Sequence, residues 1–143
     1  MPIPTLTEDD PAALPIFPLP EAALLPGTVV PLHVFEPRYR ELTRDALARR
    51  RMLALARLKP GFERDYAGRP PVFEVCGAGE IVDHLIHADG RYDIVLRGLS
   101  RIRILNELPP ARAYREVRAT VIADLPADPA LGVEFTGYSP FLG

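Results

Sequence analysis

A chain of 143 residues with 48% hydrophobic and 25% charged residues can build one globular core but is too short for two well-packed domains. Its formal net charge of −2 argues against a polyelectrolyte partner, and no apolar run approaches the ~18 residues of a membrane span. The single cysteine, Cys76, excludes an internal disulfide and a cysteine-rich zinc site, and no signal pattern opens the chain, so we expect a cytoplasmic domain.

Prolines dominate the N-terminal third of the chain. Residues 1–13 contain three prolines and several acidic residues without an apolar period, which predicts a flexible leader. Beyond them, prolines interrupt the apolar runs Ile16–Leu19 and Thr28–Val34. Because proline has no amide hydrogen to donate, we expect both runs to be edge strands, or strands that start and stop at a proline, along a rim. Pro26-Gly27 predicts a type II turn between them.

One helix is expected directly after the second run. Pro37 suits the first helical position, where an amide hydrogen would have no partner in the helix. Behind it Tyr39, Leu42, Ala46 and Leu47 fall on one face at helical spacing, which predicts an amphipathic helix with this stripe against the core.

From Met52 to Ala123 the sequence is typical of β-structure. Asp89-Gly90 predicts a tight hairpin, Gly77-Ala78-Gly79 a kink or bulge, and Gly98 a bend. The segment from Phe62 to Pro71 is expected to be the longest internal loop. The expected strands are Met52–Leu58, which should be buried on both faces, Val72–His87, Tyr92–Leu108 and Tyr114–Ala123. With one helix, they predict a small closed or half-closed β-structure.

The segment FPLPEAALLPGTVVPLHVFEPRYREL resembles the opening of the Lon-protease N-terminal domain family. The tract from Pro31 to Tyr39 matches the family's proline-leucine-histidine-hydrophobic-phenylalanine-glutamate-proline-arginine-tyrosine signature without a gap. A looser resemblance, which includes DGRYDIVLRGLSRIRILNEL, extends to about Asp124. The resemblance implies a mainly β PUA-like pseudo-barrel of about six strands with one principal helix over residues 14–124. It also implies non-enzymatic binding of protein or unfolded polypeptide.

The sequence departs from the complete proteases of that family. Residues 125–143 contain Gly132, Gly137 and Pro140, which do not allow the helical bundle that usually follows the barrel, so we expect a short or truncated tail. Gly77-Ala78-Gly79 lacks the pattern of a nucleotide-binding loop. The sole lysine, Lys59, has no serine with the flanking pattern of a nucleophile. We therefore expect neither ATPase nor peptidase activity, and no cofactor.

Cysteine and histidine offer two further chemistries. Cys76 with His84 or His87 would form a thiol-imidazole pair, but a cysteine within an apolar strand is more often a small buried hydrophobe. His84 and His87 are three apart on a strand and should point to opposite faces, while His33 would need a chance approach from the rim. The sequence therefore predicts no metal site and no catalytic residue.

Candidate contact residues lie near the helix start and in the long internal loop. They are Phe35, Glu36, Arg38, Tyr39, Phe62 and Tyr66. One interpretation is a recognition site beside the helix N-terminus, whose free amides attract anions. The alternative is that the polar members, Glu36 and Arg38, simply hydrogen-bond the loops around them.

Two kinds of partner remain open. Rim strands leave unpaired backbone groups that an extended peptide can join, which favours a protein or peptide partner. The alternative is an RNA-binding PUA-like domain, with Arg97, Arg101 and Arg103 along a strand face. The near-neutral net charge counts against RNA.

Overall fold

The computed structural model describes residues 13–21 and 23–122. The leader predicted over residues 1–13, except its last residue, and the tail predicted over residues 125–143 lie outside the described residues. The described part contains six strands, one α-helix and one short 3-10 helix. They are β1 (Leu14–Leu19), β2 (Val29–Val34), α1 (Pro37–Ala48), β3 (Met52–Arg57), η1 (Phe62–Asp65), β4 (Val75–Ile86), β5 (Tyr92–Glu107) and β6 (Arg115–Ile122).

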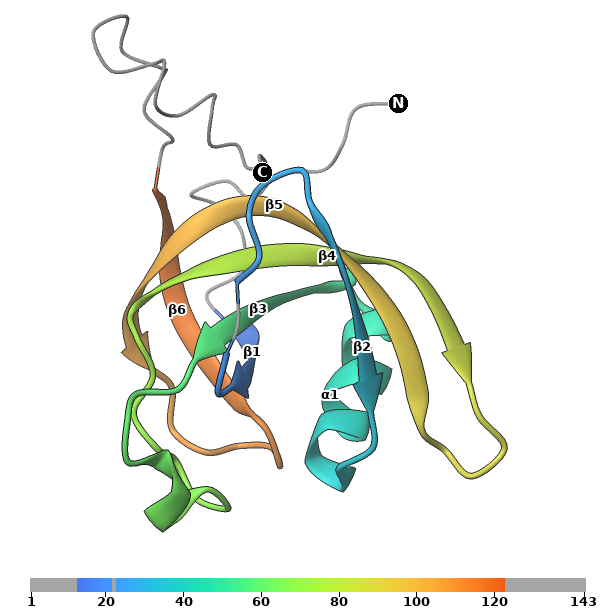
Figure 1. Cartoon of the computed structure of the whole chain (residues 1–143), viewed down its shortest axis with the longest axis horizontal. Helices are drawn as coiled ribbons and strands as arrows, with labels where there is room; N and C mark the ends of the chain where they lie inside the picture. Colours follow the sequence, from blue (N-terminus) through green and yellow to red (C-terminus); the bar gives the residue numbers. More distant parts are fainter. Residues whose placement is uncertain (1–12, 22, 123–143) are drawn as a thin grey trace, which may run out of the picture.

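The strands form one sheet that closes on itself. Their order is β2-β5-β4-β3-β1-β6, and β5 also pairs with β6, so five strands form a ring and β2 is added to it through β5. Figure 1 shows β4 and β5 arching over the molecule and ending in a hairpin that projects beyond the barrel. This architecture confirms the predicted mainly β fold with a single helix.

The long strand β5 serves both parts of the sheet. Its first half pairs with β2 and its second half with β6, while β4 runs beside most of its length. Gly98 lies between the halves, and a Cβ there would be only 2.1 Å from the carbonyl oxygen of Leu25. The segment before β2 therefore crosses directly over this glycine. β4 is continuous, with a register shift at Ala78/Gly79 where the sequence predicted a kink.

The expectation that β1 lies on the rim was wrong. β1 has β6 on one side, from Leu14 to Ile16, and the parallel strand β3 on the other, from Ile16 to Leu19. Pro15 is thus paired only with β6, and Pro18 only with β3. Each proline has a neighbouring strand on one side only, so its nitrogen, which carries no hydrogen, can face the side without a strand. The prolines fit an interior strand because that strand changes partners midway.

The expectation for the second run was correct, because β2 is an edge strand that pairs with β5 alone among the described residues. Gly98 donates its amide hydrogen to Thr28 across the start of this ladder, at 2.8 Å. Because bonding pairs alternate in an antiparallel ladder, the backbone groups of Val29, Pro31 and His33 point away from β5. Pro31 therefore occupies a position where no ladder bond is lost.

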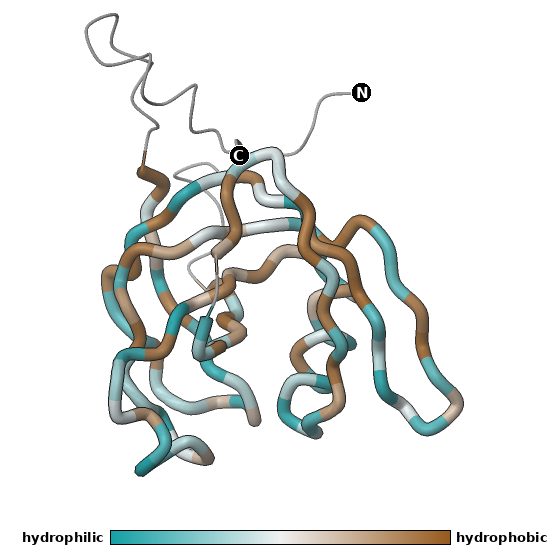
Figure 2. Tube along the Cα trace, in the orientation of Figure 1, coloured by the Kyte–Doolittle hydropathy of each residue, from teal (hydrophilic) through white to brown (hydrophobic). Residues whose placement is uncertain are grey.

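The core has two parts, one on each face of the β1–β3 pair. Ile16, Ala54 and Ile102 belong to the cluster inside the barrel. Leu42 of α1 and Leu53 of β3 belong to the cluster on the other face, which α1 covers. In Figure 2 hydrophobic segments follow the strands and alternate with hydrophilic ones. Neither helix among the described residues could serve as a membrane span.

Candidate functional site

Most of the predicted contact residues meet at the start of α1. The hydroxyl of Tyr66 donates a hydrogen bond of 2.7 Å to Glu36, and Arg38 donates one of 3.1 Å to the carbonyl of Tyr66. The ring of Phe62 lies 6.3 Å from that of Tyr66. The polar groups bond to one another and fasten the 62–69 loop, the part of the expected Phe62–Pro71 loop that begins with η1, to the start of α1. This geometry favours the alternative interpretation, in which Glu36 and Arg38 hold the loops around them.

Tyr39 belongs to the core. It is 3% exposed, and its ring stacks on that of Phe17 with centroids 4.3 Å apart. Burial raises the pKa of its hydroxyl to about 12. The sequence placed Tyr39 among the contact residues, but the structure leaves it almost no accessible surface.

Phe35 lies apart from the other predicted residues. It follows the last residue of β2, is 56% exposed, and has its ring centroid 6.0 Å from that of His33. It thus borders a second surface, which sequence reasoning did not describe. We call this surface the outer arm: the three-stranded sheet of β2, the first half of β5 and the second half of β4.

The register of the outer arm brings distant residues together. His33 of β2 and Leu85 of β4 both lie opposite Asp93 of β5, and Pro31 and Asp83 both lie opposite Val95. These two sets of opposed residues border a shallow hollow that spans all three strands. Beyond Glu80, β4 no longer pairs with β3, so this part of β4 pairs only with β5 among the described residues.

Large apolar side chains are exposed around the outer arm. Val29, Leu85 and Ile86 are 57%, 58% and 56% exposed. In a monomeric protein, apolar side chains gathered beside an unpaired strand edge mark a binding surface or an aggregation liability. The outer arm is therefore the candidate binding surface of the described residues.

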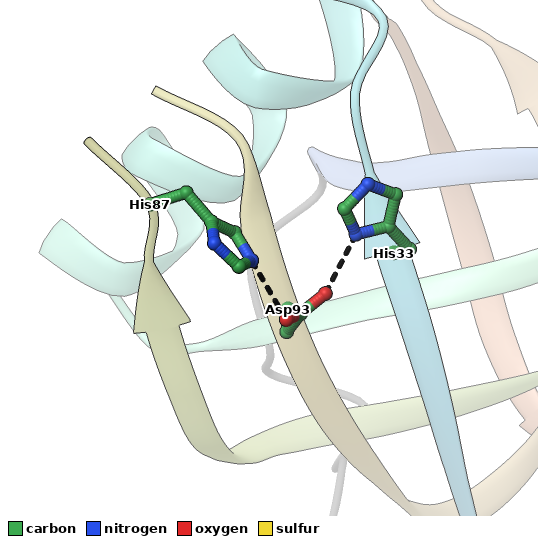
Figure 3. A group of neighbouring side chains, drawn as sticks. All are labelled: His33, His87 and Asp93. Carbon is green, nitrogen blue, oxygen red and sulfur yellow. Dashed lines mark hydrogen bonds and ion pairs between the residues drawn. The ribbon is translucent and has the colours of Figure 1, made fainter. Parts of the chain in front are cut away.

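Two histidines meet one carboxylate on the outer arm (Figure 3). His33 Nδ1 lies 2.6 Å from one oxygen of Asp93, and His87 Nε2 lies 2.7 Å from the other. These hydrogen bonds, first that of His33 and then that of His87, lower the pKa of Asp93. From the sequence, His33 was expected to come near the other histidines only by chance, but the β2–β5 register places it directly opposite Asp93.

The structure gives less support to a thiol-imidazole pair at Cys76 and to RNA binding by the β5 arginines. Burial raises the pKa of Cys76 to about 12, which disfavours the nucleophilic thiolate. Cys76 and His84 are eight residues apart on β4, which corresponds to roughly 25 Å of extended strand. Among the arginines of the RNA alternative, Arg103 is bonded to Glu74 at 2.9 Å, so an acidic neighbour balances its charge.

The described residues define a small β-barrel domain with one covering helix and an exposed edge strand. The model of the ATP-dependent protease La (LON) substrate-binding domain matches residues 13–134, and the chain belongs to this family. The match confirms the resemblance found in the sequence.

Curated relatives are much longer than this chain. Lon protease of Anaeromyxobacter dehalogenans (strain 2CP-C) is 30% identical over 117 residues, which are 82% of this chain and 14% of that protein. Lon protease 2 of Myxococcus xanthus is 28% identical over 130 residues, which are 91% of this chain and 16% of that protein. The chain thus spans about one seventh of the relatives it matches.

Solved structures agree on the fold. A Lon N-terminal domain protein from Xanthomonas campestris superimposes with a TM-score of 0.67 at 26% identity, over 91% of this chain and 73% of that one. The N-terminal domain of Mycobacterium avium complex Lon protease gives a TM-score of 0.66 at 23% identity, over 91% of this chain and 65% of that one.

Proposed function

We propose that this domain binds extended segments of other proteins, in particular unfolded polypeptide, at the outer arm. The observation that carries the proposal is the edge of β2, which has a partner strand on one side only in the described part of the chain. The outward amides of Val29 and His33, and the carbonyl groups beside them, are available to an added strand. Backbone pairing of this kind accepts many sequences.

Exposed apolar side chains on the outer arm, of the edge strand β2 and of β4 on the far side of β5, add contact without a narrow pocket. Val29 and Leu85 are more than half exposed and lie on different strands of the outer arm. An extended ligand presents alternate side chains to such a surface, so apolar residues at every second position should bind best. We propose a cytoplasmic binding role without catalysis, as expected for a substrate-binding domain.

Charge substitution on the outer arm tests the proposal. We expect Val29→Lys and Leu85→Lys each to weaken binding of a permanently unfolded polypeptide by about tenfold, or ~1.4 kcal/mol, because each removes apolar contact area from the complex. Leu105→Lys is the matched control, since Leu105 is 59% exposed on β5 beyond the outer arm. Equal effects of all three substitutions would contradict the proposed surface.

A salt titration separates protein binding from RNA binding. Affinity for a single-stranded RNA should fall steeply with salt, because phosphate contacts release counterions. Apolar capture of an unfolded polypeptide should change little over the same range. Tight, salt-sensitive RNA binding that Arg101→Ala and Arg103→Ala abolish would favour the RNA alternative over the proposal.

A further inference from the structure

We propose that His33, His87 and Asp93 bind one late first-row transition-metal ion, with Zn²⁺ as the representative ion. The ligand atoms of the three side chains lie within 4.8 Å of one another. They come from β2, from the residue after β4 and from β5, so the hairpin and the edge strand must both be in place to assemble them. The site shares His33 with the edge strand, but the metal would use its imidazole, whereas the proposed polypeptide binding uses its backbone amide.

The sheet register explains why the three side chains converge. His33 and Asp93 are direct cross-strand neighbours, a position that brings Cβ atoms to about 5 Å. His87 stands at the hairpin, where its amide donates a 2.8 Å hydrogen bond to Arg91. Its ring centroid is 5.9 Å from that of His33. Figure 3 shows both imidazoles turned toward the carboxylate between them.

The donor set selects the class of ion. Two imidazole nitrogens and one carboxylate oxygen suit Zn²⁺, Co²⁺, Ni²⁺ or Cu²⁺, whereas Ca²⁺ and Mg²⁺ prefer oxygen ligands. Donor atoms around tetrahedral zinc are about 3.3 Å apart. Each 2.6–2.7 Å contact with Asp93 must therefore open by less than an ångström. Side chains that are 30% to 48% exposed have room for this movement.

Metal binding requires a change of tautomer at both histidines. A carboxylate only accepts hydrogen bonds, so His33 Nδ1 and His87 Nε2 carry hydrogen when they face Asp93. Each nitrogen must present a lone pair to a metal ion, so the hydrogen has to reside on the other ring nitrogen. Three half-exposed ligands and this rearrangement predict weaker binding than at a structural site with four buried ligands.

Arg91 opposes the metal-bound state. Its Nη1 lies 3.3 Å from His33 Nε2, the nitrogen that must carry the hydrogen when Nδ1 binds metal. An arginine only donates hydrogen bonds, so this contact is lost, and the positive charge also repels the ion. We expect Arg91→Ala to bind Zn²⁺ about threefold to tenfold more tightly than the wild type. Equal or weaker binding by this variant would contradict the ligand assignment of His33 Nδ1.

Calorimetric titration of the tag-free chain with Zn²⁺ tests the site directly. We expect saturable binding of one ion, which His33→Ala, His87→Ala and Asp93→Asn each weaken by at least about tenfold. His84→Ala is the matched control, because the chain has three histidines and His84 lies opposite Ile94 on the other face of β4. It should keep wild-type affinity. Circular dichroism of each variant verifies that it is folded.

Two results would overturn the proposal. One is the absence of saturable Zn²⁺ binding by the folded wild-type chain. The other is an equal loss of affinity in His84→Ala and in the folded ligand variants, which would indicate non-specific binding to surface histidines. Co²⁺ provides a second readout, since its visible absorption reports nitrogen and oxygen ligands and should disappear in His87→Ala but not in His84→Ala.

Discussion

The hydroxyl of Tyr66 donates a 2.7 Å hydrogen bond to Glu36, thirty residues earlier in the chain. The two residues join the loop after β3 to the residue that precedes α1. Arg38 extends this contact, because its guanidinium lies 5.2 Å from the ring centroid of Tyr66 and bonds to the backbone of the same loop. The contact fixes a long loop against the helix.

Removal of this hydroxyl should loosen the loop without impairing binding. We expect Tyr66→Phe to lower the free energy of unfolding by about 1 kcal/mol, the usual net value of one hydrogen bond, as measured by chemical denaturation. Affinity for an unfolded polypeptide should remain at the wild-type value. A variant with wild-type stability and lost binding would instead make the Tyr66 hydroxyl a contact of the ligand.

The inner face of α1 should be critical for stability. Leu42 is fully buried, so Leu42→Ala removes packed methyl groups and leaves a cavity, at an expected cost of roughly 2–5 kcal/mol in chemical denaturation. Arg44→Ala is the control on the outer face and should cost under about 0.5 kcal/mol, since the Arg44 side chain is 66% exposed. A fully stable Leu42→Ala that fails to bind polypeptide would place the binding surface on α1.

Acid should weaken the fold through Glu107. Burial alone would raise the pKa of its carboxyl, but two hydrogen bonds of 2.8 Å from the buried Arg115 and the charge of Arg69 lower it below its ordinary 4.5. A pKa lowered by folding contributes stability above the unfolded value, and this contribution is lost as the pH falls below 4.5 toward the folded value.

The Glu107→Gln variant isolates this contribution. At neutral pH we expect a loss of about 1.5–3 kcal/mol, because charge-assisted hydrogen bonds are lost, and a flatter dependence of stability on pH below 4.5. Glu74→Gln, which breaks an ion pair whose partners are 48% and 66% exposed, should change stability by less than about 0.5 kcal/mol. If the stability of Glu107→Gln falls below pH 4.5 as steeply as that of the wild type, other carboxylates cause the loss of stability in acid.

Local signals made several elements predictable from the sequence. Gly27 has the positive φ of 82° that a type II turn requires, and Thr28 donates to Leu25 across the turn at 3.1 Å. Gly90 closes the predicted hairpin with a φ of 95°. In each case a few consecutive residues determine the backbone, so no knowledge of distant partners is needed.

Features that depend on long-range pairing were missed. The prolines of β1 indicated a rim strand, but the sequence does not show that β6 covers one half of this strand and β3 the other. The His33–Asp93 contact likewise depends on the pairing of β2 with β5, sixty residues apart. The tight hairpin at Gly90 brings His87 near Asp93 through local structure, although this contact was not predicted, whereas the approach of His33 requires the tertiary fold.

Residue-resolved amide hydrogen exchange is the most direct test of strand addition at β2, because Val29 and His33 present their amides on the outward side of this strand. On addition of an unfolded polypeptide, we expect both amides to gain protection, while Val30 and Leu32, which already face β5, change little. The variants Val29→Lys and Leu85→Lys should reduce this gain, and Leu105→Lys should not. Unchanged exchange at Val29 and His33 in the saturated complex, with protection confined to the 62–69 loop or to Arg101 and Arg103, would contradict strand addition at β2.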